Sequence, residues 1–202
     1  MTPELPIYKL IVTDDENIAW KYTALVDKPA TAELFIAFKE QESINHFEFK
    51  VANDEKRIVM GALMVANLPI LRVDEATKQQ FLVVLDEVNI EKALQKFFKQ
   101  GNQKNVNEMH DPKKVVNDVY MYQAFIINKE MGINTPKGFN EVPDGSAFGV
   151  FKVDNDQVWQ DIKAGKYKGF SIEGMFVQEP MTNLTDEEIG LLTDALEGSN
   201  LN

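Results

Sequence analysis

Two short segments of the sequence contain residue types that could together perform nucleophilic chemistry. Residues 105–111 place His110 at the end of an extended stretch, and residues 169–174 hold Ser171 between glycines. Ser171 follows His110 by 61 positions, and the chain has 2 histidines in all, so His46 is the one alternative base. A serine hydroxyl is a poor nucleophile until a base removes its proton, and imidazole titrates near neutral pH. The segments therefore predict Ser171 as nucleophile and His110 as general base.

The alternation of side chains along a strand gives Ser171 a possible acidic neighbour. Ser171 and Glu173 would share one face, about 6 to 7 Å apart, while Phe170 and Ile172 point into the core. A histidine on an adjacent strand could contact both polar residues, and a third group usually orients the imidazole. The candidates for that third group are Glu173, Asp111, Glu108 and the acids Asp186, Glu187, Glu188 and Asp194 near the C-terminus.

Each of these residues also has a purely structural interpretation. Serine is common in strands, a histidine before Asp-Pro is typical of a turn, and Glu173 could be a solvent-exposed strand residue. The residue pattern alone leaves both interpretations open.

The composition limits the class of protein. With 202 residues we expect one domain over residues 1–202, whose core needs no disulfide or metal. The absence of cysteine excludes a thiolate nucleophile. The net charge of −11 argues against nucleic-acid binding, and neither a signal peptide nor a membrane span is apparent. No phosphate loop, dinucleotide fingerprint or metal motif occurs, so we expect no cofactor and no metal.

Strand signals dominate the hydrophobic pattern of the chain. Strands are expected around Ser171 and over residues 7–12, 46–51, 58–65, 68–73, 81–85, 119–127 and 148–153.

Three segments have the apolar spacing of helices: 90–98, 156–164 and 186–197. We therefore expect an α+β fold with a mostly antiparallel, barrel-like sheet and about three flanking helices, with a doubly wound parallel sheet as the weaker alternative. The expected end signals are Asn89 and Gly101 for the first helix, a cap at residues 154–156 and Gly165 for the second, and a Thr185/Glu188 capping box for the third.

Four blocks of the sequence resemble the XkdF-like phage serine proteases. They are residues 24–30, 61–72, 106–111 and 158–174, of which the last is the most specific. This family is the prophage-type branch of the prohead maturation proteases, which are similar in fold to the herpesvirus assemblins. The resemblance implies the order His110 then Ser171 for base and nucleophile, and a barrel-like sheet surrounded by helices.

The same resemblance implies a role in phage head maturation, in the host cytoplasm inside the assembling procapsid. The expected substrates are the scaffold and major capsid proteins, and a homodimer is compatible with the resemblance. The chain ends soon after its protease-like part, so we expect the scaffold to be a separate protein. The alternative function is a non-catalytic head-assembly or scaffold-binding module of the same fold. An esterase, the third possibility, would need a deep apolar pocket behind Ser171, whereas a protease should show an extended groove.

The sequence departs from the herpesvirus branch in one respect. No histidine follows Ser171, so an acid must complete the triad or the site works as a dyad, and Glu173 is the acid we expect. The glycine-bearing loops 132–138 and 145–149 are candidate sources of oxyanion-hole N–H groups.

Overall fold

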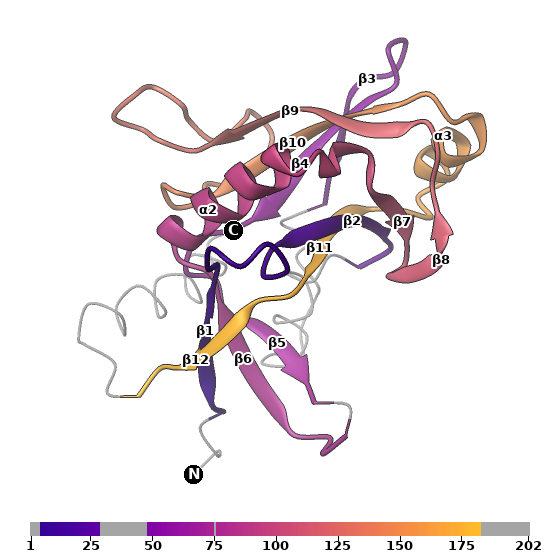
Figure 1. Cartoon of the computed structure of the whole chain (residues 1–202). Helices are drawn as coiled ribbons and strands as arrows, with labels where there is room; N and C mark the ends of the chain where they lie inside the picture. The colour runs from indigo at the N-terminus through magenta and orange to yellow at the C-terminus, as the bar shows by residue number, and fades with distance from the viewer. Residues whose placement is uncertain (1–4, 29–47, 75, 183–202) are drawn as a thin grey trace, which may run out of the picture.

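The computed structural model describes residues 5–28, 48–74 and 76–182, and strands make up 42% of the structure. These strands form three four-stranded sheets, A, B and C (Figure 1). The orders are β12-β1-β6-β5 in sheet A, β11-β2-β7-β8 in sheet B and β3-β4-β10-β9 in sheet C. The strands are β1 (Ile7–Ile11), β2 (Trp20–Val26), β3 (Lys50–Asn53), β4 (Ile58–Met64), β5 (Ile70–Val73), β6 (Gln80–Val84), β7 (Val106–Glu108), β8 (Asp111–Val115), β9 (Val119–Ile126), β10 (Ala147–Val153), β11 (Gly169–Gly174) and β12 (Val177–Pro180).

Two α-helices occur in the described residues, α2 (Glu87–Lys99) and α3 (Asp156–Lys163), together with the short 3₁₀ helix η1 (Asn102–Lys104). The Asp86 side chain caps α2 by accepting from the Asn89 N–H at 2.8 Å. Asn89, the cap expected from the sequence, lies inside the helix instead. Its Oδ1 accepts from the Val12 N–H at 2.8 Å and fastens β1 to α2. The other expected end signals of these two helices are confirmed. Gly101 and Gly165 have φ of 73° and 75°, and Asn155 caps α3.

The expectation of an α+β fold with a barrel-like sheet and about three helices is wrong. The fold is mostly β, and none of the three sheets closes on itself. The third expected helix, residues 186–197, lies outside the described residues. A single closed sheet was wrongly expected because β2, β7 and β8 carry no clear alternation in the sequence. In the structure these three strands join β11 in a sheet of their own. The predicted strands are thereby divided among three open sheets.

The core lies where α2 and sheets B and C meet. Trp20 of β2 stacks on Phe97 of α2 with ring centroids 3.7 Å apart. Phe151 of β10 stacks on Phe170 of β11 at 4.3 Å. All four side chains are buried in one apolar cluster. Because buried aromatic side chains contribute strongly to packing, this cluster holds β11 rigidly against the rest of the protein.

The end of β11 is fixed by a close backbone approach. A Cβ atom at Gly174 would lie 2.8 Å from the Cα of Trp20 and would overlap the carbonyl oxygen of Ala19. That same carbonyl accepts from the Met175 N–H at 3.2 Å. Position 174 therefore admits only glycine without displacing the strand that carries Ser171.

We expect Gly174→Ala to lower the free energy of unfolding by about 3 kcal/mol or more, because its Cβ must displace backbone atoms. The matched control is Gly132→Ala, at a glycine with φ of 77° and no atom within 4 Å of its would-be Cβ, which should cost about 1 kcal/mol. Urea denaturation followed by circular dichroism measures both. Equal losses in the two variants would contradict the steric argument.

Candidate active site

Strand β2 lies between the strand that carries Ser171 and the strand that leads to His110. On one side β2 pairs antiparallel with β11, with Ala24 opposite Ser171 and Tyr22 opposite Glu173. On its other side β2 pairs parallel with β7. Ser171 and Glu173 thus lie on β11, an edge strand of sheet B. Both side chains line the same pocket, as expected for alternate residues of a strand.

His110 lies in a tight turn rather than in a strand. Strands β7 and β8 form a hairpin with Glu108 opposite Asp111, so Met109 and His110 are its two loop residues. Their φ angles are 51° and 59°, and the Met109 N–H donates to the Leu25 carbonyl of β2 at 3.0 Å. Two-residue loops with positive φ favour Asn-Gly over Met-His, so this turn stores backbone strain. The strained turn directs the imidazole across β2 towards β11.

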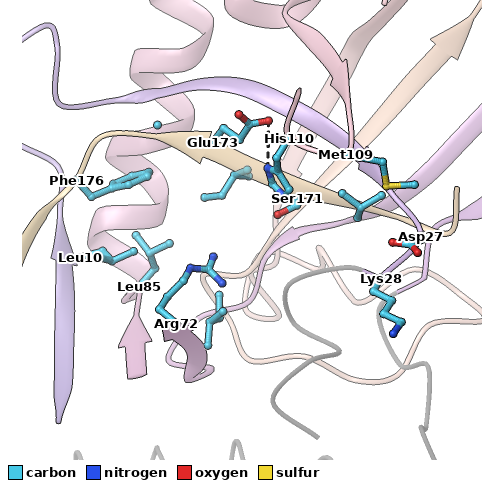
Figure 2. A pocket seen from close by; sticks show the side chains of 14 residues that line it. Leu10, Asp27, Lys28, Arg72, Leu85, Met109, His110, Ser171, Glu173 and Phe176 are labelled. Atoms are coloured by element: carbon cyan, nitrogen blue, oxygen red, sulfur yellow. Dashed lines mark ion pairs between the residues drawn. The ribbon is translucent and has the colours of Figure 1, made fainter. Parts of the chain in front are cut away.

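One open pocket of about 730 Å³ brings the predicted residues together. Ser171, His110 and Glu173 all line it. Figure 2 shows the imidazole of His110 between the side chains of Glu173 and Ser171. Sheet A supplies much of the opposite wall, and the apolar lining residues include Leu10, Ile70, Leu85, Ile172 and Phe176.

The His110 imidazole contacts Glu173 directly. Nδ1 of His110 lies 3.2 Å from Oε1 of Glu173, and that oxygen is buried. Oε1 has no hydrogen-bond partner among the described residues. The contact is therefore an ion pair when the imidazole is protonated. The Ser171 side chain is 3% exposed, and within the described chain no hydrogen bond of 3.5 Å or less joins it to His110.

The other acids proposed as third members have different neighbours. Asp111 accepts from the Lys113 N–H at 2.9 Å and lies 3.8 Å from the Lys114 ammonium. Glu108 lies beside Tyr167, where burial, and to a lesser degree the Glu108 charge, raise the pKa of the tyrosine hydroxyl. The four acids of residues 186–194 lie outside the described residues, as does His46. In the described structure the acid beside His110 is thus Glu173.

The glycine loops proposed for an oxyanion hole lie elsewhere. Neither the 132–138 loop nor the 145–149 loop lines the Ser171 pocket. A Cβ at Gly145 would meet Glu87, and both residues line a different cavity. Sequence reasoning also missed Arg72, which enters the Ser171 pocket from β5. No local pattern marks Arg72, because only the packing of sheet A beside sheet B brings it there.

No group of three or more His, Asp or Glu side chains is arranged to hold a metal ion in residues 5–28, 48–74 and 76–182. No helix in those ranges is long and apolar enough to cross a membrane.

The strained turn yields a prediction about stability. We expect Met109→Asn to raise the free energy of unfolding by about 0.5 to 1 kcal/mol, because asparagine adopts positive φ more readily than methionine. The Met109 N–H and its bond to Leu25 are retained. Thermal unfolding of the variant beside Met131→Asn, an exposed methionine outside the hairpin, measures the difference. A loss of stability confined to Met109→Asn would show that the turn is not strained.

Comparison with known proteins identifies a family. A family model described as "Putative phage serine protease XkdF" matches residues 45–179. Searches of curated proteins and of solved structures found no match. The matched residues include both segments that contain His110 and Ser171, and they span more than half of the chain. The chain therefore belongs to the family that this model describes, which is named for the putative phage serine protease XkdF.

Proposed function

We propose that this chain is a serine endopeptidase of phage head maturation that cleaves scaffold and capsid proteins. Membership of a phage serine protease family supports the reaction class. The observation that carries the proposal is the shared pocket of Ser171, His110 and Glu173, with His110 Nδ1 3.2 Å from Glu173 Oε1. This arrangement holds a nucleophile, a base and an acid around one pocket.

The mechanism follows from which imidazole nitrogen is already engaged. Because Nδ1 faces Glu173, Nε2 is the nitrogen that can take the Ser171 proton. The serine oxygen then attacks the scissile carbonyl, and His110 returns the proton to the leaving amine. Water repeats the cycle by attacking the acyl-serine ester, with His110 again as the base. The Glu173 carboxylate stabilises the imidazolium that forms at each step.

The shape of the cavities favours a peptide over a small ester as substrate. The open pocket beside Ser171 measures about 730 Å³, whereas the cavity behind it, lined by Phe170 and Leu63, measures about 20 Å³. An esterase of small apolar substrates would need depth behind the serine. The open pocket instead suits a chain segment that lies across the surface.

One observation favours the second candidate, a non-catalytic scaffold-binding module. The Ser171 hydroxyl makes no hydrogen bond of 3.5 Å or less to His110 within the described chain. Catalytic hydrogen bonds are often long before substrate binds, so the missing hydrogen bond is compatible with both functions. Cleavage of the natural partner distinguishes the two functions.

We expect Ser171→Ala to abolish cleavage when the protein is co-expressed with the scaffold and major capsid proteins of its phage. The control is Ser146→Ala, because Ser146 is also buried but its Oγ accepts from the Ala66 N–H at 3.0 Å. That variant should lose about 1 to 3 kcal/mol of stability yet retain cleavage while it is folded. Gel electrophoresis and mass spectrometry of the products decide. Equal product from wild type and Ser171→Ala would exclude Ser171 as the nucleophile.

The variant Glu173→Gln tests whether Glu173 is the third member of the catalytic triad. An amide keeps the size of the side chain but cannot compensate the imidazolium charge, so we expect turnover to fall at least about 100-fold with the fold intact. Asp111→Asn removes an acid that is next to His110 in sequence but lies near the Lys114 ammonium, and it should change turnover less than about threefold. Peptide cleavage rates, with folding checked by circular dichroism, compare the two. Small effects in both variants would indicate a Ser-His dyad.

A further inference from the structure

We propose that Ala24 of β2 is a positioning residue of the site, because its small side chain leaves room for the His110 imidazole to reach β11. This inference rests on the proposed protease function and adds to it a residue that sets the place of the base. Strand β2 lies between β7 and β11 in sheet B. A side chain that extends from the β7–β8 hairpin to β11 must therefore cross β2.

The strand registers identify Ala24 as the residue that the imidazole crosses. Residues directly opposite each other on neighbouring strands point to the same face of a sheet, and Ala24 is opposite Ser171. Glu173 is at the level of Tyr22 on β2. The β7–β8 hairpin is at the level of Leu25, whose carbonyl accepts a backbone N–H of the hairpin at 3.0 Å. Because side chains alternate along a strand, Ala24 is the position of β2 that lies between these two levels and shares the face of Ser171.

The contact made by the imidazole and the burial of Ala24 agree with this placement. His110 Nδ1 lies 3.2 Å from Glu173 Oε1, and Figure 2 shows the imidazole between the side chains of Glu173 and Ser171. Ala24 is 0% exposed, whereas Tyr22, two positions away on the same face, is 37% exposed. The Ala24 methyl group is therefore covered on a face that is otherwise partly open, as expected if the imidazole lies above it.

A larger side chain at position 24 would displace the imidazole rather than the core. The next residue, Leu25, points to the opposite face and is buried in the main apolar cluster, which fixes β2 in place. His110 is held less firmly, because its side chain is 46% exposed and lies in a two-residue turn with positive φ. Strands favour β-branched residues over alanine, so the space above β2 explains the small side chain better than strand propensity does. A shift of about 1 Å in a catalytic group can lower the rate about 100-fold.

Replacement of Ala24 tests this role with peptides taken from a cleaved scaffold or capsid sequence. We expect Ala24→Val to lower kcat at least about 100-fold and to change KM less than about threefold, because the base moves and the walls that bind the peptide do not. Ala24→Gly adds no atoms above β2 and should keep kcat within about tenfold of wild type. The matched control is Ala147→Val, because Ala147 is also a strand residue with 0% exposure but lies on β10 outside the pocket. That variant should lose stability by overpacking yet retain kcat while it is folded.

A second measurement needs neither a variant nor catalysis, and it separates this inference from the proposed function. Nuclear magnetic resonance of the wild-type protein with labelled alanine methyl groups should show a nuclear Overhauser contact between Ala24 and a ring proton of His110, with the Ala147 methyl as the negative control. If this contact is present but wild type cleaves no scaffold or capsid sequence, the protease proposal fails and the placement of the imidazole over Ala24 stands. If the contact is absent, or if Ala24→Val cleaves with the kcat of wild type, the role of Ala24 is overturned.

Discussion

The two-sided backbone pairing of β2 is the constraint on which the site depends. The register that sets Ala24 opposite Ser171 is fixed by the hydrogen bonds to β11, and the parallel register with β7 fixes where the hairpin of His110 begins. A one-residue slip in either register would turn the polar side chains of one strand to the opposite face. The packing of Trp20 on Phe97 and the glycine at position 174 hold β2 and β11 against such a slip. The same contacts thus pack the core and fix the geometry of the site.

The pocket places charges of both signs in an acidic protein. The only acid that contacts the imidazole in the described structure comes from β11, and the arginine faces it from a different sheet. Opposite charges held on separate rigid elements do not collapse onto each other as they would on one flexible loop. The two sheets therefore hold these groups on different walls of one pocket.

Local sequence patterns predicted most elements and missed their assembly. The strands β4, β9 and β10 and the helices α2 and α3 lie close to where apolar spacing put them. The strand β2 was missed, because a strand buried on both faces, with Ala24, Leu25 and Val26 all inaccessible, shows no alternation. Pairing of distant strands is not encoded in any one window, so the barrel was wrongly expected. Strand alternation predicted that Ser171 and Glu173 share a face and left Glu173 as one of several acids for His110, whereas the contact itself, Arg72 and the hairpin strain required the tertiary structure.

The order of the paired strands along the chain also controls when the site can form. Strand β2 lies early in the sequence, β7 near the middle and β11 late, so sheet B is built from long-range contacts. Such contacts form slowly, because the entropy of closing long loops must be overcome before any pairing energy is gained. Until β11 has been synthesised, the chain lacks Ser171 and the part of the pocket wall that β11 supplies. The pocket can therefore form only after the late strand β11 has paired with the early strand β2.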